Sequence, residues 1–67
     1  MSPWRMSTTI RRLRDDRGMT QAQLAKRARV TQGYISQLEA GAKKDIGAKV
    51  AVRLAKALNV PVMELLR

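Results

Sequence analysis

The sequence contains neither cysteine nor histidine. Disulfide bonds are therefore excluded, and so are the usual sets of zinc ligands. A chain of 67 residues has no room for a second hydrophobic core, because a fold of this size buries only roughly 60% of the surface that the unfolded chain exposes. Packing around a single core must supply the stability, and a reducing, intracellular setting fits the composition.

Long hydrophobic runs are also missing. Residues 1–6 do not form an apolar stretch of signal-peptide length, and no later stretch is long enough to cross a bilayer. We therefore expect a soluble, cytoplasmic protein in which residues 1–6 are an N-terminal extension and residues 7–67 form one domain.

Acidic residues are scarce, with 5 against 14 basic residues and a formal net charge of +9. Without histidine or cysteine, these acids do not form a plausible acid–base pair or metal cluster, so we expect no enzyme, no cofactor and no small-molecule substrate. They are Asp15, Asp16, Glu39, Asp45 and Glu64. The positive charge favours a polyanionic partner, nucleic acid before an anionic membrane surface.

Apolar residues recur at helical spacing and strand alternation is missing, which predicts an all-α fold. Turn residues divide the chain into about five short helices, which with their caps span residues 7–17, 20–28, 31–40, 45–58 and 62–66. The residues that share a helix face are Ile10, Leu13 and Arg17; Leu24, Ala25 and Ala28; Ile35 and Leu38; and Val50, Leu54 and Leu58. Helices this short bind a membrane interface weakly, so nucleic acid remains the favoured partner.

Boundary residues support these helices. Glycine and asparagine tolerate the left-handed conformation beyond a helix C-terminus, and threonine and aspartate side chains cap a helix N-terminus. The expected boundaries are Gly18 after the first helix, Thr20 with Gln23 as a capping box, Thr31 before the third helix, Asp45 before the fourth, Asn59 after it, and Pro61 at the start of the last.

The second and third helices are joined by Arg29-Val30-Thr31, which is too short a link for an antiparallel hairpin. The two helices must therefore cross steeply. Two short helices joined in this way describe a helix-turn-helix, whose second helix enters the major groove of DNA with its N-terminal residues toward the base edges.

The outer face of the third helix is polar but uncharged. If Ile35 and Leu38 point inward, the opposite face carries Gln32, Gly33, Ser36 and Gln37. A glutamine amide can bond N7 and the N6 amino group of adenine together, although glutamine and serine are also ordinary surface residues. A glycine inside a helix costs roughly 0.5 to 1 kcal/mol relative to alanine. Close approach to DNA and tolerance in the first helical turn both explain Gly33.

Other residues are of the kind that contacts phosphates. The candidates are Gln21, Thr31, Tyr34, Lys43 and Lys44. Gln21 also stands at a helix N-terminus, where free backbone N–H groups attract anions.

Several runs of this sequence together resemble the lambda-repressor and Cro type of helix-turn-helix, the XRE family. They are residues 10–14, 18–25, 31–41 and 54–58, and the resemblance extends over about residues 7–66. Thr-Gln-x-x-Leu-Ala followed at this spacing by Ile-Ser-x-Leu-Glu-x-Gly is highly specific. The resemblance implies a compact five-helix bundle, and a transcriptional regulator, usually a dimer on a two-fold-related operator and here expected to be a repressor.

The resemblance also implies roles for single residues. Gln32 would be the leading base reader, and Gln21 would hold a phosphate. Arg14 and Glu39 match a buried ion pair between the first and third helices. Three positions depart from the family pattern: Arg29 and Asn59 stand where glycine is common, and Gly33 replaces a side chain that often reads bases.

The C-terminal region has more apolar positions than one short helix can turn toward its own core. They are Val60, Val62, Met63, Leu65 and Leu66. We expect a homodimer in which Met63 and Leu66 form the exposed contact. The alternative function is an antitoxin or bridging-type module that binds a protein partner as well as DNA. Beyond the last helix only Arg67 remains for such a partner, unless Trp4 and its neighbours serve.

Overall fold

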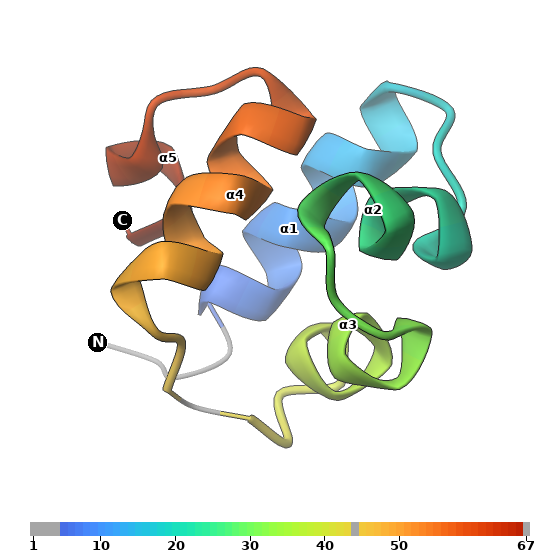
Figure 1. Cartoon of the computed structure of the whole chain (residues 1–67), viewed down its shortest axis with the longest axis horizontal. Coiled ribbons are helices and arrows are strands. Elements are labelled where there is room, and N and C mark those ends of the chain that lie inside the picture. The colour runs from blue at the N-terminus through green and yellow to red at the C-terminus, as the bar shows by residue number, and fades with distance from the viewer. Residues whose placement is uncertain (1–4, 44, 67) are drawn as a thin grey trace.

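The computed structural model describes residues 5–43 and 45–66, except the side chains of Arg5 and Leu66. In these ranges the chain forms helices and no strand, which confirms the predicted all-α class. The helices are α1 (Arg5–Asp16), α2 (Gln21–Ala28), α3 (Gln32–Glu39), α4 (Ala48–Leu58) and α5 (Val62–Leu66). Figure 1 shows α4 and α5 on one side of the bundle, α2 and α3 on the other, and α1 behind them.

A single core lies among the five helices, and each of them contributes at least one fully buried side chain. The largest are Ile10, Leu24, Ile35, Leu38, Leu54, Leu58 and Leu65. Helix α4 packs against α2 and α5, whereas α3 packs against α1 and α2. The residues predicted to share a helix face therefore largely lie in or against this core. Arg17 is an exception, because it is exposed and its Nη1 donates to the Leu13 carbonyl at 3.1 Å.

Most helix ends lie where the sequence predicted them. Thr20 and Gln23 form the expected capping box before α2. Gly18 and Asn59 take the left-handed conformation, with φ of 64° and 57°. Helix α1 is one exception, since it begins at Arg5 and ends at Asp16 rather than spanning residues 7–17. Trp4 lies outside the described residues.

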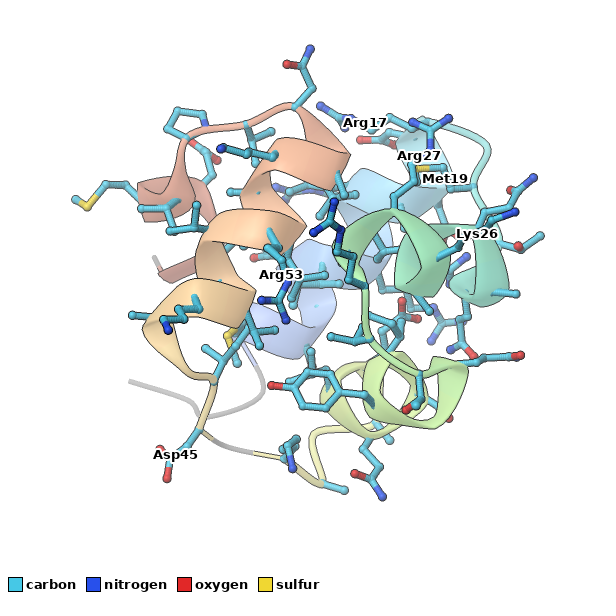
Figure 2. The ribbon with its side chains drawn as sticks, in the orientation of Figure 1. Arg17, Met19, Lys26, Arg27, Asp45 and Arg53 are labelled. Carbon is cyan, nitrogen blue, oxygen red and sulfur yellow. The ribbon has the colours of Figure 1, made fainter. Side chains whose placement is uncertain are left out.

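The start of α4 differs from the prediction. Its N-cap is Gly47, which offers no side-chain hydrogen bond, and not Asp45. Asp45 is exposed and points away from the bundle in Figure 2. The reason is tertiary, because Ile46 packs against the core. Residues 45–47 are therefore not helical, Gly47 is extended, and the helix begins at Ala48.

Candidate nucleic-acid interface

Residues 29–31 join α2 to α3 and determine where α3 begins. Arg29 ends α2 in the left-handed conformation, with φ 59° and ψ 42°. Thr31 then caps α3, because its Oγ1 accepts a hydrogen bond from the backbone N–H of Tyr34 at 3.0 Å. Helices α2 and α3 also pack directly against each other. The N-terminal end of α3 is thus held firmly next to the turn.

The outer face of α3 carries the four predicted base-facing residues. Gln32, Gly33, Ser36 and Gln37 are all exposed. Ile35 and Leu38, on the inner face, have 0% exposure. The bundle therefore presents a polar, uncharged helix face to solvent.

Glycine at position 33 is not required by packing within the chain. A Cβ atom built there would meet only the Thr31 Oγ1, at 3.9 Å, which is ordinary van der Waals contact. The residue has no positive φ that would favour glycine. Both explanations from the sequence therefore stand, and a Cβ atom fits at this position within the chain.

Arg14 and Glu39 form an ion pair between α1 and α3. The Arg14 Nε donates to Glu39 Oε2 at 2.7 Å, and its Nη2 donates to Oε1 at 2.9 Å. Only 12% of the Arg14 side chain and 5% of the Glu39 side chain are exposed. Arg14 Nη1 also donates to the Met19 carbonyl at 2.7 Å, just before α2. Through this bidentate ion pair and the bond to Met19, Arg14 connects α1, the α1–α2 loop and α3.

The charge state of Glu39 follows from these contacts. Burial alone would raise the pKa of Glu39, and it is the largest single effect. Hydrogen bonds from Arg14 and Gln21, with the charges of Arg14 and Arg11, together outweigh it and lower the pKa. The hydrogen bond with Glu39 correspondingly raises the pKa of Arg14. Both groups are therefore charged at neutral pH.

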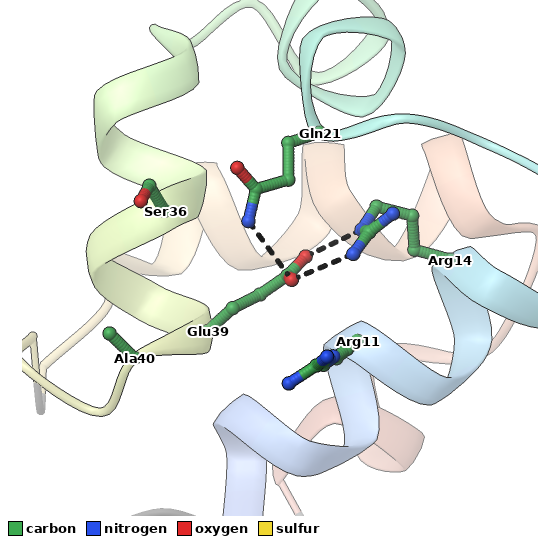
Figure 3. Close-up of a pocket in the computed structure, with 6 residues that line it drawn as sticks. All are labelled: Arg11, Arg14, Gln21, Ser36, Glu39 and Ala40. Carbon is green, nitrogen blue, oxygen red and sulfur yellow. Dashed lines mark hydrogen bonds and ion pairs between the residues drawn. The ribbon is translucent and has the colours of Figure 1, made fainter.

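The side chain of Gln21 is hydrogen-bonded within the protein. It was predicted to hold a phosphate, and its side chain is half-buried, with Nε2 donating to Glu39 Oε1 at 3.2 Å. Figure 3 shows Gln21 of α2 and Arg14 of α1 converging on the Glu39 carboxylate from α3. The second N–H of Gln21 Nε2 and the backbone N–H groups at the N-terminus of α2 are the donors with which it would meet a phosphate.

Arg11 is a residue of this region that the sequence analysis missed. With Arg14, Gln21, Ser36, Glu39 and Ala40 it lines a polar cleft beside the outer face of α3. Figure 3 shows Arg11 on α1 near Glu39. The spacing offered a signal, since Arg11 and Arg14 are three positions apart and share one face of α1.

The remaining phosphate candidates lie at the two ends of α3. Thr31 is exposed at its N-terminus, and its hydroxyl already serves as the cap. Tyr34 is half-buried, and Lys43 Nζ lies 5.1 Å from the centre of its ring. Lys44 lies outside the described residues. The structure thus brings Lys43 to Tyr34, beside the outer face of α3.

The predicted contact surface on α5 is only partly apolar and exposed. Met63 is 69% exposed, whereas Leu65 is fully buried in the core. Val60 and Val62 are half-buried. The side chain of Leu66 lies outside the described part of the chain.

Comparison with known proteins decides the family. The family model for the helix-turn-helix matches residues 10–65. The chain belongs to the helix-turn-helix family. It is therefore a DNA-binding transcription regulator and not an enzyme, with the lambda-repressor-like fold that the XRE resemblance implied.

Two regulators of solved structure resemble this helix-turn-helix protein. It is similar to the restriction-modification controller protein C.AhdI from Aeromonas hydrophila, with a TM-score of 0.84 and 27% identity, over 90% of this chain and 89% of that chain. Two structures of the clp gene regulator ClgR from Corynebacterium glutamicum match with 33% identity and TM-scores of 0.80 and 0.83. They cover 91% of this chain and 78% and 64% of those chains. No curated protein sequence matches the chain significantly.

Two further findings concern residues 5–43 and 45–66. No group of three or more histidine, cysteine, aspartate or glutamate side chains there could hold a metal ion. No helix in the same ranges is long and apolar enough to cross a membrane.

Proposed function

We propose that the protein recognises a specific double-stranded DNA sequence by placing α3 in the major groove, and that it acts as a repressor. The observation that carries the proposal is the outer face of α3, which is exposed, uncharged and held at its N-terminus by the Thr31 cap. Gln32 leads this face and pairs with adenine, while Gly33, Ser36 and Gln37 lie over the neighbouring base pairs.

Contacts with the DNA backbone position this helix. Gln21 and Thr31 approach phosphates from the N-termini of α2 and α3, where backbone N–H groups and the helix dipole favour an anion. Tyr34 and Lys43 hold the adjacent strand, with Lys44 beside them in the sequence. The net charge of +9 supports this arrangement, since each phosphate neutralised by a cation releases condensed counterions.

The active form is a homodimer. Met63, 69% exposed on α5, is the centre of the proposed contact, and Leu66 follows three residues later on the same helix face. A two-fold dimer would place two α3 helices in successive major grooves, about 34 Å apart. Binding in this form would cover about two turns of DNA, and it would repress transcription where the operator overlaps a promoter.

Selection of bound sequences from a random duplex library tests the proposed function. We expect a symmetric motif with two half-sites about one helical turn apart, centre to centre. Recovery of sequences without any shared motif would show that the protein binds DNA by charge alone.

A further inference from the structure

A second basic surface lies between the C-terminal end of α2 and the middle of α4. It is a cleft lined by Arg27, Arg29, Arg53, Lys56 and Ala57, which we name the arginine cleft. Figure 2 shows Arg27 of α2 and Arg53 of α4 on the face turned toward the viewer. None of the four cations takes part in the two ion pairs found among the described residues, which both belong to Arg14. Four positive charges therefore face one cleft without an acidic partner.

Arg53 is held in place within this cleft. Its Nε donates to the Ala28 carbonyl at the end of α2, at 2.9 Å, and the side chain is half-buried. A guanidinium has five N–H donors, so this bond leaves most of them available. An arginine fixed at one nitrogen offers its other nitrogens in a defined orientation, which suits phosphate better than a mobile lysine would.

Arg29 occupies a conformation that arginine rarely adopts. Its φ of 59° lies in the left-handed region, which glycine and asparagine adopt more readily than other residues. The same chain uses Asn59 in this conformation after α4. Local strain retained at one residue indicates that its side chain has a use beyond closing the helix.

The cleft includes Arg29, which belongs to the turn that leads into α3. Arg29 stands three residues before Gln32, so their Cα atoms are at most about 11 Å apart. B-DNA carries one negative charge per about 1.7 Å of helix axis, so phosphates beyond the segment under α3 lie within reach of this distance. An acidic protein segment would also match the charge, but the position of Arg29 in the turn before α3 favours DNA.

We propose that the arginine cleft binds phosphates of the DNA that flanks the segment contacted by α3. The inference rests on the proposed function and extends the DNA-binding surface from α3, around the 29–31 turn, to α4. The flanking contact is independent of sequence, so it adds affinity without changing the motif that is recognised.

Two duplexes test the inference. One carries only the motif selected from the random library. The other extends it with arbitrary sequence by about six base pairs at each end, about 20 Å at 3.4 Å per base pair. Wild-type protein should bind the extended duplex more tightly, by about threefold to tenfold per cleft cation engaged at low salt.

Substitutions in the cleft should remove this difference. We expect Arg29→Asn, and Arg27→Gln combined with Lys56→Gln, to weaken binding of the extended duplex and to leave the short duplex nearly unchanged. The slope of log affinity against log salt should fall by about 0.9 per lost contact on the extended duplex only. Arg29→Asn should also melt no lower than wild type, since asparagine tolerates the left-handed conformation.

Lys26→Gln is the matched control, because Lys26 is an exposed cation on α2 that does not line the cleft. It should affect both duplexes alike.

Equal affinity of wild type for the two duplexes, or equal losses on both in the cleft variants, would overturn the inference while leaving recognition by α3 intact. Cleft variants that keep full DNA affinity but lose binding to polyglutamate would assign the cleft to an acidic polypeptide and also overturn it. Wild-type protein that binds no DNA would contradict the proposed function itself.

Discussion

Glu39 is the residue at which α1, α2 and α3 are joined. Its carboxylate accepts hydrogen bonds from Arg14 and from Gln21, although only 5% of its side chain is exposed. A buried carboxylate is stable only when its partners are present, since the loss of solvation is large. The contribution of Glu39 to stability therefore depends on the ion pair with Arg14 rather than on either charge alone.

We predict that Glu39→Ala destabilises the protein by about 3 to 5 kcal/mol, because it removes the buried counter-charge of the Arg14 guanidinium and leaves only the exposed carboxylate of Asp15, 3.3 Å from Nη1. This is a large part of the stability of a small domain. Replacing Arg14 and Glu39 together by apolar residues should cost less than Glu39→Ala alone. Chemical denaturation measures both effects, and equal unfolding free energies for wild type and Glu39→Ala would contradict the prediction.

The pH dependence of Glu39 follows from its lowered pKa. Because the folded-state pKa lies below the ordinary value of 4.5, the ionised carboxylate stabilises the fold above that value. This contribution is lost as the pH falls through the lowered folded-state pKa. The stability difference between wild type and Glu39→Gln should thus be full at neutral pH and shrink on acidification below about pH 4.5. Urea denaturation across this range is the measurement, and a difference that grows on acidification would be incompatible with it.

Some side-chain contacts could not be predicted from the sequence. Arg14 and Glu39 were paired only through the family resemblance, since they are 25 positions apart. The bond from Arg53 to the Ala28 carbonyl has the same separation and no sequence signal. Contacts of this kind depend on how the helices pack, and helical spacing does not report them.

Helix ends follow mainly from local chemistry, which is why most were predictable. The Thr20 capping box and the Thr31 cap each involve residues only three positions apart. The start of α4 was not predictable in this way. There, burial of Ile46 decided the outcome over the capping preference of Asp45.

The corrected start of α4 yields a paired prediction. Gly47 has φ −65° and ψ 149°, which any residue adopts, and a Cβ there meets nothing within 4 Å. Gly47→Ser should therefore stabilise the protein by about 0.5 to 1 kcal/mol, through a new cap and a less flexible unfolded chain. Asp45→Ala should change stability by less than about 0.5 kcal/mol. Thermal melts compare the two, and a large loss in Asp45→Ala would restore Asp45 as a structural cap.

At the scale of the whole molecule, the apolar residues of α5 divide between the core and the surface. Leu65 belongs to the core, whereas Met63 is 69% exposed. The sequence predicted an excess of apolar side chains here, but only the packing of α5 against α1 and α4 shows which of them face outward.

We predict that Met63→Glu converts the dimer to a monomer without unfolding it, because it places two like charges across the two-fold contact. Analytical ultracentrifugation would detect the change, with Val52→Glu as a control at an exposed apolar position on α4. Wild-type protein that is monomeric both free and on operator DNA would refute the dimer, whereas a dimer that forms only on DNA agrees with it.

We expect α3 to read bases while cations outside α3 hold the DNA backbone. Comparison of Gln32→Ala with Lys43→Ala tests this division most directly. Gln32→Ala should lower affinity for the selected operator by about 1 to 3 kcal/mol and leave random duplex nearly unchanged. Lys43→Ala should weaken both duplexes and reduce the log–log salt slope by about one per lost contact, or about two per dimer. If Gln32→Ala instead weakened both duplexes equally and changed the slope, Gln32 would be a backbone contact and base reading by this residue would be wrong.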